Sequence, residues 1–541
     1  MQRALLKSWL LVLLALASGR AWAQAPTWKT AFLVGGNAYS QIKATATDDA
    51  GNVYVTGFFS NVTLVLGNIT LTNAVTSGGS VGLSNDFFLA KWSPVSQTFV
   101  WAVRAGGNTN YDAGQSLVVS GSSVYVVARL SGVGFGGAAV PAGSYLAKFT
   151  DAGALGWSMP APELVAASSG GLYVAASFTG TASFGATTLT SAGSSDIVVA
   201  KLLDAGNTFS YAWAQRAGGA GDDTPTALTA QGSTLYLTAG TAGSATFGSA
   251  TTGSASAGCV ARLTDAGSTG SFDWVQAAPG AYFRAVAASG GSVYVGGSYA
   301  DAVTLGATQF AAPGMVGYFL ARLTDTAAGG SFAWAWQAAP PGNNNPVTIE
   351  ALVATPRYVY LSGRLGVAAT FGPTTLVPVQ SDLYVARLTP GGAAGSFDWG
   401  VSASAINMPF AAALSVVGAT VYVAGVLMGP ATFGEVAVST VGGGVAFLAS
   451  LTDNAALPTR AGAELPGLTI FPNPAHGPAT ARVPAGAGPA TVQVLDALGR
   501  VVQRAAVAAG QDYALTGLAP GVYAVRVQVG EAAATQRLVV E

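Results

Sequence analysis

The chain repeats one unit of about 60 residues, and this repetition limits its fold more than any other feature. A tyrosine recurs in short runs such as "VYVTG" and "LYLTA", and each copy continues with a second apolar run such as "YLAKF" or "CVARL". The repeated tyrosines are Tyr54, Tyr125, Tyr173, Tyr236, Tyr294, Tyr360 and Tyr422, and the accompanying tryptophans are Trp28, Trp101, Trp157, Trp213, Trp274, Trp334 and Trp399. The span from Trp28 to Leu451 covers 424 residues, or about 61 for each of seven copies.

The pattern inside each copy predicts β-strands. Apolar and small polar residues alternate over four to eight positions between glycine-rich turns, and no segment shows sustained helical periodicity. Several short strands per copy fit a four-stranded blade, and seven blades fall within the range of closed propellers. We therefore predict an all-β chain with a seven-bladed β-propeller over residues 24–453. An open β-solenoid ranks second, because its coils are shorter.

The order of the strands predicts how the ring closes. Each copy is expected to run from an inner strand (Ala227–Ala230 in one copy) through the tyrosine strand and the "AKL" strand to an outer tryptophan strand. The last copy ends at "AFLASLTD" without its tryptophan strand, whereas residues 26–36, "PTWKTAFLVGG", supply a spare one. We expect this N-terminal strand to complete the last blade, which would hide strand edges that otherwise promote aggregation.

The repeats resemble the bacterial β-propeller repeats known as SBBP repeats. The resemblance covers about residues 26–455 and is clearest in "DDAGNVYVTG", residues 48–57. It implies a propeller but no single activity.

The N-terminus reads as a secretory signal peptide, residues 1–23. Arg3 and Lys7 precede the apolar run from Trp9 to Ala17, which is too short for a membrane span. Small residues then predict cleavage between Ala23 and Gln24, so we expect a secreted protein without a transmembrane segment.

Composition excludes several classes of function. Only 9% of residues are charged and the net charge is −1, which argues against nucleic acid or anionic membranes as partners. The single Cys259 cannot form an internal disulfide, and with one histidine the chain cannot supply most zinc sites. We predict no metal and no cofactor.

Beyond residue 453 the repeat stops. Residues 454–467 are rich in Pro, Ala and Gly and read as a linker. Residues 468–541 carry a different strand pattern, with "ATVQVLDALGRVV", "LAPGVYAVRVQV" and the terminal "TQRLVVE". We predict a small β-sandwich here.

Residues 468–541 resemble the type A C-terminal sorting domain of the type IX secretion system of certain Gram-negative bacteria. The matching elements are "FPNPA", "VLDALGRVV", "LAPGVYAVRV" and "QRLVV", which include Phe471, Pro472, Asn473, Pro474, Gly521 and Tyr523. The resemblance implies recognition by the outer-membrane secretion machinery, followed by attachment at the cell surface or release. Pro472 and Pro474 favour extended neighbours. His476 follows the motif and is expected to be an exposed turn residue.

The ring offers little for catalysis. It has no histidine, so Ser-His-Asp and Cys-His arrangements cannot be built within it. Its acidic residues are few, and one set follows the "AKL" strands, where we expect local turn hydrogen bonds: Asp151, Asp204, Asp265, Asp325 and Asp453. We predict no catalytic residue.

Ligand binding is expected where the copies differ most, in the loops from each tryptophan strand to the next inner strand. The candidates are Tyr111, Asp112, Asp222, Asp223, Tyr282, Arg284 and Asn344; an ordinary role as exposed loop residues is the alternative. Two adjacent aspartates are weak evidence for calcium, which takes six to eight oxygens.

Three functions follow from these features. We favour an exported, non-enzymatic protein that binds a glycan or a protein through one face of the propeller. The alternative is a structural or adhesive surface protein without a small ligand. A carboxylate-based enzyme acting on polysaccharides ranks third.

Overall fold

The computed structural model describes residues 25–35, 39–75, 84–107, 112–160, 162–312, 314, 316–326, 329–338, 346–405, 409–440, 443–453, 468–483, 489–496, 501–508, 510–529 and 532–541. The expected signal peptide (1–23), its cleavage site at Ala23 and Gln24, and the expected linker (454–467) lie outside these ranges. Contacts divide the chain into two compact units, Met1–Ala456 and Leu457–Glu541. Within the described ranges the regular elements are strands, apart from one short 3-10 turn, η1 (Phe135–Gly137), so the chain is all-β as predicted.

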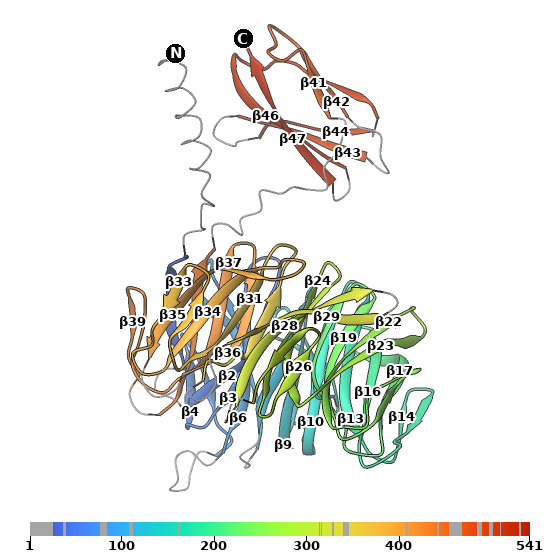
Figure 1. The fold of residues 1–541 in the computed structure, drawn as a ribbon. Coiled ribbons are helices and arrows are strands. Elements are labelled where there is room, and N and C mark those ends of the chain that lie inside the picture. The colour runs from blue at the N-terminus through green and yellow to red at the C-terminus, as the bar shows by residue number, and fades with distance from the viewer. Residues whose placement is uncertain are drawn as a thin grey trace, which may run out of the picture. The chain divides into compact units, whose positions relative to one another are not determined.

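The first unit is built from four-stranded antiparallel sheets that share one strand order (Figure 1). The described residues of this unit hold seven such sets of four strands: five are separate sheets, and two continue through their fourth strands into a hairpin as six-stranded sheets. Each set is called a sheet here, is numbered by its place in the chain and is written from first strand to fourth. They are β2 (Ser40–Thr47), β3 (Val53–Phe59), β6 (Asp86–Ser93), β7 (Thr98–Ala105); β8 (Ala113–Ser120), β9 (Ser123–Val133), β10 (Ala139–Thr150), β11 (Leu155–Pro160); β12 (Leu164–Ser168), β13 (Gly171–Phe178), β16 (Asp196–Asp204), β17 (Phe209–Gly219); β18 (Thr224–Gln231), β19 (Thr234–Thr241), β22 (Ala257–Asp265), β23 (Gly270–Pro279); β24 (Ala281–Ser289), β25 (Ser292–Tyr299), β28 (Gly317–Thr326), β29 (Gly329–Gln337); β30 (Ala351–Ala354), β31 (Val359–Leu365), β34 (Asp382–Thr389), β35 (Ser396–Ala405); and β36 (Phe410–Val417), β37 (Thr420–Leu427), β40 (Val445–Thr452), β1 (Trp28–Val34).

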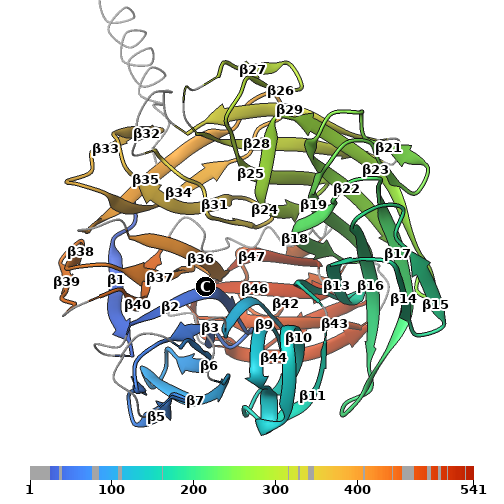
Figure 2. The ribbon, with the colours of Figure 1, turned by 90° about the horizontal axis from the view of Figure 1, so that it is seen from below.

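The sheets form a closed ring. Their first strands contact one another in a cycle that runs β2, β8, β12, β18, β24, β30, β36 and back to β2. Figure 2 shows the sheets of this unit arranged around a common centre. The arrangement is propeller-like and excludes the open stack that ranked second.

The N-terminal strand completes the last sheet. β1 pairs antiparallel with β40, from Trp28 opposite Leu451 to Val34 opposite Ala446. The indole Nε1 of Trp28 donates to the carbonyl of Ser402 on β35 at 3.0 Å. This pairing confirms the predicted closure of the ring by its two chain ends.

Burial explains the sequence pattern of the strands. The second and third strands of each sheet face neighbouring sheets on both sides, and every residue of β3, "VYVTGFF", is buried. Apolar clusters fill the junctions between neighbouring sheets; Tyr173, Val199 and Leu237, for example, share the cluster between the third and fourth sheets. Small Ala and Val side chains suit this layered packing because the interior is densely filled.

Six short hairpins connect second strands to third strands in the described residues. They are β4 (Thr63–Leu66) with β5 (Ile69–Thr72), β14 (Thr181–Phe184) with β15 (Thr187–Thr190), β20 (Ala245–Phe247) with β21 (Ala250–Thr251), β26 (Val303–Leu305) with β27 (Thr308–Phe310), β32 (Ala369–Phe371) with β33 (Thr374–Leu376), and β38 (Ala431–Phe433) with β39 (Val436–Val438). In four of these hairpins the turn holds the glycine of a repeated "TFG" or "SFG" segment, at Gly185, Gly248, Gly372 and Gly434. Each has a positive φ, 61° at Gly248, a conformation that residues with a Cβ rarely adopt.

The second unit has two sheets around one core. A three-stranded sheet contains β41 (Thr469–Phe471), β42 (Ala479–Arg482) and β45 (Asp512–Leu515); a four-stranded sheet contains β44 (Val501–Ala508), β43 (Pro489–Leu495), β46 (Gly521–Val529) and β47 (Ala532–Val540). Ile470 and Leu515 of the first sheet share a buried cluster with Val494 and Val527 of the second. β43, β44, β46 and β47 lie in the segments whose pattern predicted strands, whereas β41 and β42 were not predicted.

Candidate functional site

The loop residue Asp112 has a structural environment. Its side chain is buried, and its carboxylate accepts hydrogen bonds from the backbone amides of Gly107 (2.9 Å) and Ser131 (2.5 Å). A carboxylate held in this way positions loops and is closed to a ligand, so we revise its predicted role in binding. Two other predicted ligand-binding residues, Tyr111 and Asn344, lie outside the described ranges.

Asp223 occupies the same kind of position two sheets further on. It is buried, and it accepts hydrogen bonds from the amides of Gly219 (2.7 Å) and Ala242 (3.2 Å). Burial raises the pKa of Asp223, the two amides oppose this effect, and the nearby charges of Asp196 and Asp222 add to it. We revise the predicted ligand contact of Asp223 for the same reason.

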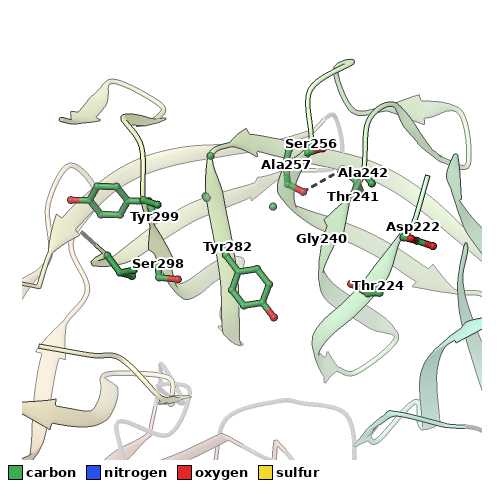
Figure 3. Close-up of a pocket in the computed structure, with 15 residues that line it drawn as sticks. Asp222, Thr224, Gly240, Thr241, Ala242, Ser256, Ala257, Tyr282, Ser298 and Tyr299 are labelled. Carbon is green, nitrogen blue, oxygen red and sulfur yellow. Dashed lines mark hydrogen bonds between the residues drawn. The ribbon is translucent and has the colours of Figure 1, made fainter. Parts of the chain in front are cut away.

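Two other candidates, Asp222 and Tyr282, lie at a pocket between the fourth and fifth sheets (Figure 3), and Arg284 lies beside Tyr282 without lining the pocket. The volume of the pocket is about 440 Å³, which is in the range of small-molecule sites. Asp222 and Tyr282 line it, and the guanidinium carbon of Arg284 lies 5.3 Å from the centre of the Tyr282 ring. Figure 3 shows Tyr282 on β24 between Ser298 on one side and Thr224 on the other.

The pocket wall is mixed in polarity. Among the described residues that line it, Asp222 is the one charged residue, and its Oδ1 accepts a hydrogen bond from the hydroxyl of Ser195 at 3.2 Å. Thr224 and Ser256 add exposed hydroxyls, while Ala257 and neighbouring alanines form apolar wall. The site therefore presents an acceptor, several donor–acceptor hydroxyls and an aromatic ring.

The wall of the pocket includes two glycines that face each other across β19 and β22. Gly240 pairs with Gly258, and no other sheet has glycine at both of these register positions in the described residues. The corresponding pairs are Phe58/Phe87, Arg129/Ser144, Ser177/Ile197, Ser298/Tyr318, Arg364/Leu383 and Val426/Ala446. The sequence interpretation missed this departure, although alignment of the seven copies would have revealed it.

The two glycines have different structural roles. A Cβ at Gly258 would lie 2.6 Å from the carbonyl oxygen of Ala281, so the approach of the fifth sheet requires glycine there. A Cβ at Gly240 would meet only the hydroxyl of Thr224, at an ordinary 3.7 Å. Packing does not require glycine at 240, so the empty space beside it belongs to the pocket.

The aspartates that follow the "AKL" strands join neighbouring sheets; the predicted local turn bonds are present at Asp204 and Asp265, but the prediction missed the contacts between sheets. Each accepts a hydrogen bond from the repeated tyrosine of the preceding sheet and is paired with the lysine or arginine of that sheet. The Tyr–Asp–Lys/Arg sets are Tyr54–Asp151–Lys91, Tyr125–Asp204–Lys148, Tyr173–Asp265–Lys201, Tyr236–Asp325–Arg262 and Tyr360–Asp453–Arg387. Turn contacts also exist, as from the amide of Gly267 to Asp265, but they are not the main role.

The set around Asp265 shows the electrostatics of these junctions. Its carboxylate accepts bonds from Lys201 Nζ (2.6 Å), Tyr173 Oη (2.8 Å) and Trp213 Nε1 (2.9 Å). Burial alone would raise the pKa of Asp265, but these three hydrogen bonds outweigh it and lower the pKa. Burial and the hydrogen bond to the carboxylate both raise the pKa of Tyr173. These groups are bound into the packing between sheets.

Other chemistry-bearing residues do not form a centre in the part of the chain that the structure describes. No group of three or more His, Cys, Asp or Glu side chains there has an arrangement that could hold a metal ion. Cys259 is fully buried, and burial raises the pKa of its thiol. The side chain of His476 is 80% exposed and lies 3.4 Å from a carboxylate oxygen of Glu541. Among the described residues, no helix is long and apolar enough to span a membrane.

The sorting-motif residues lie at one end of the second unit's core. Phe471 ends β41 and is 41% exposed, and the peptide bonds before Pro472 and Pro474 are cis. The side chain of Asn473 bonds to the last strand, donating to the Arg537 carbonyl (2.6 Å) and accepting from the Val539 amide (2.9 Å).

A second segment that matches the sorting domain, "LAPGVYAVRV", leads into strand β46. Gly521 is the first residue of β46, and Tyr523 lies on the same strand. The hydroxyl of Tyr523 donates to the Ala519 carbonyl at 2.8 Å, which ties the strand to the turn before it.

Residues 469–541 match a family model described as a secretion system C-terminal sorting domain. This match identifies the second unit as a sorting tail and indicates export and delivery to the cell surface by the type IX secretion machinery. The comparison with curated proteins found no match.

Similar solved structures are distant. They include a quinohemoprotein alcohol dehydrogenase from Comamonas testosteroni (10% identity, TM-score 0.35, covering 82% of this chain and 79% of that one) and the plexin A4 extracellular region (8%, 0.39, 94% and 67%). A third is a mutant Trypanosoma rangeli sialidase with trans-sialidase activity (11%, 0.33, 78% and 82%). At these scores the likenesses carry no argument about function.

Proposed function

We propose that the chain is an exported, non-enzymatic binding protein whose ring holds a ligand in the pocket between its fourth and fifth sheets. In this proposal the ring is a seven-bladed β-propeller of SBBP-type repeats and the tail is a β-sandwich that directs it to the outer face of the outer membrane. The open pocket carries the proposal.

The pocket supports binding over a purely structural role. Its glycine pair departs from the pattern of the other sheets, and its rim places Tyr282 and Asp222, both exposed, beside a cavity of small-molecule size. A structural surface protein would need no such interruption of its repeat.

The ring's acidic residues favour binding over catalysis. Glycosidic chemistry uses two carboxyl groups that flank one bond. Asp222 is the one carboxylate in the described pocket wall, and its neighbour Asp223 is buried and bonded to loop amides. The polysaccharide-active alternative would require both aspartates to act.

Two measurements test the proposal. In a bacterium with a type IX system, protease added outside the cells should reach the full-length chain but not a chain that ends at residue 453. Glycan and peptide arrays probed with the purified mature chain should show a ligand whose signal falls when Tyr282→Ala is introduced. Cleavage of a polysaccharide panel that is lost on Asp222→Asn, or self-assembly with no ligand on either array, would contradict it.

A further inference from the structure

We propose that the pocket between the fourth and fifth sheets receives an uncharged sugar residue of a glycan chain. This inference rests on the proposed binding function and names the ligand class for the same pocket. It is carried by the ring of Tyr282, the single carboxylate of the wall and the hydroxyls around it.

Tyr282 supplies the apolar contact. Its side chain is 48% exposed at the pocket, which is unusual for a large ring in a chain that buries most of its aromatic residues. A pyranose has C–H faces that pack on an aromatic ring, while the phenol hydroxyl stays available for polar contact. The guanidinium of Arg284, 5.3 Å from the ring centre, already provides the cation that such a ring attracts. The ring is therefore better suited to a neutral face than to a cationic ligand.

The polar groups complement sugar hydroxyls. An ionised carboxylate only accepts hydrogen bonds, so Asp222 suits a ligand that donates several. The exposed hydroxyls of Thr224 and Ser256 can donate or accept, which matches the ring oxygen and remaining hydroxyls of a sugar. A peptide strand would instead seek an unpaired strand edge, and β19 and β22 are paired on both sides.

The negative charge at the pocket favours neutral sugars over acidic ones. Asp222 lines the wall; burial raises the pKa of the adjacent Asp223, and the nearby charges of Asp196 and Asp222 add to this effect. No lysine or arginine is among the described residues that line the pocket; Arg284, whose guanidinium carbon lies 5.3 Å from the centre of the Tyr282 ring, is not one of them. A uronic or sialic acid would therefore bring its carboxylate towards like charge, which disfavours binding.

The size and the exposed rim of the pocket suit one sugar residue of a longer glycan. The cavity of about 440 Å³ is in the range of small-molecule sites, and its rim residues Asp222 and Tyr282 are exposed. A glycan can therefore continue into solvent on either side of the bound residue.

The test uses the purified mature chain, residues 24–541, on a neutral glycan array, followed by calorimetry with the best neutral oligosaccharide and with trigalacturonate. Tyr282→Ala removes the ring, and Gly240→Val fills the pocket at a position where a Cβ meets no close neighbour. The matched control is Ser177→Val, at the same register position in the third sheet, which does not line the pocket. We expect neutral binding that falls at least about tenfold in both pocket variants and in Asp222→Asn, and is unchanged in the control.

The outcomes separate this inference from the proposed function. Trigalacturonate binding as tightly as the neutral oligosaccharide, or neutral binding unaffected by Tyr282→Ala and Gly240→Val, overturns the sugar site. Peptide-array binding that depends on Tyr282, with no neutral glycan bound, overturns the sugar class and leaves the binding function standing. No ligand on any array overturns both. If Gly240→Val lowers the thermal midpoint, the exposed Tyr282 and Asp222 substitutions decide the result.

Discussion

Two junctions between neighbouring sheets of the ring have different side chains at equivalent positions. Between the sixth and seventh sheets, Arg387 lies 2.7 Å from Asp453, and the hydroxyl of Tyr360 donates to the same carboxylate at 2.9 Å. At the seam between the seventh and first sheets, Ser450 takes the position of the arginine and Pro94 that of the aspartate. The cation and the carboxylate are absent together, because either one buried alone would be strongly destabilising.

At a third junction the cation is present although the aspartate is not. Between the fifth and sixth sheets Arg322 remains, but Pro390 replaces the aspartate. The guanidinium donates instead to the carbonyls of Gly391 (2.9 Å) and Gly392 (3.1 Å). Backbone dipoles thus satisfy the cation where no carboxylate is present, so what the ring requires is a partner and not one residue type.

The largest effect is expected at the seam itself. Removing residues 24–36 takes away β1, with the buried Trp28 and Val34, and leaves β40 as an unpaired edge. Because loss of one buried tryptophan already costs about 3–5 kcal/mol, we expect more than about 5 kcal/mol of destabilisation and aggregation. Denaturant unfolding measures it, with the exposed-residue variant Lys29→Ala as control; an unchanged midpoint would show that closure is dispensable.

The ion-paired junctions should be next in sensitivity. Asp265→Ala leaves the cation of Lys201 and the donors of Tyr173 and Trp213 without their shared acceptor, and should destabilise the ring by about 3–5 kcal/mol. The equivalent seam variant Pro94→Ala removes no such acceptor and should change stability by less than about 0.5 kcal/mol. Equal effects on the urea midpoint would mean that the two kinds of junction do not differ as described.

The seam can be converted into the other kind of junction. Ser450→Lys buries an unpaired cation and should destabilise by about 1–3 kcal/mol, since Ser450 is buried and bonded to Thr30 at 2.7 Å. Adding Pro94→Asp supplies the carboxylate and should recover about 0.5–3 kcal/mol as a coupling energy. A double-mutant cycle with a coupling near zero would refute the equivalence of these positions.

Acid should act on the junctions whose aspartate has a lowered pKa, those of Asp151, Asp204 and Asp265, and should spare the seam, with the smallest effect of the four. The pKa of Asp265 is lower in the folded chain than its ordinary value near 4, so its contribution is complete above that value and is lost as pH falls through the folded pKa. We expect the unfolding midpoint to be flat between about pH 7 and 5 and to drop below about pH 4. Asp265→Asn should flatten that drop and Pro94→Ala should not; the reverse would contradict the assignment.

The sequence was sufficient where the information lies within one copy or in the order of copies. The tyrosine strand, the four-strand order of each copy and the pairing of Trp28 with the last copy all follow from alternation and from counting strands, whereas the hairpins between second and third strands were not predicted. The contacts of Asp265 show what the sequence did not predict. Its turn partner Gly267 is two residues away, but the tyrosine it binds, Tyr173, is 92 residues away and belongs to the preceding sheet.

The candidate site was located only in part. Asp222 and Tyr282 were found because their loops vary, yet the same criterion selected Asp112, which is buried and bonded to loop amides. Variability marks a loop without showing which of its side chains faces solvent. The paired glycines of the pocket wall, Gly240 and Gly258, lie in strands and were overlooked for that reason.

The sequence by itself determined the order of the four main strands in each copy, the pairing that closes the ring and the sorting tail, because periodicity and the order of motifs can be read directly along the chain. Tertiary structure alone decided which side chains meet across sheets. Only the packing of one repeat against the next brings Asp265 to Lys201 and leaves Gly240 beside an open cavity. Contacts between repeats depend on register and on the small rotation between sheets, and neither is encoded in any single copy.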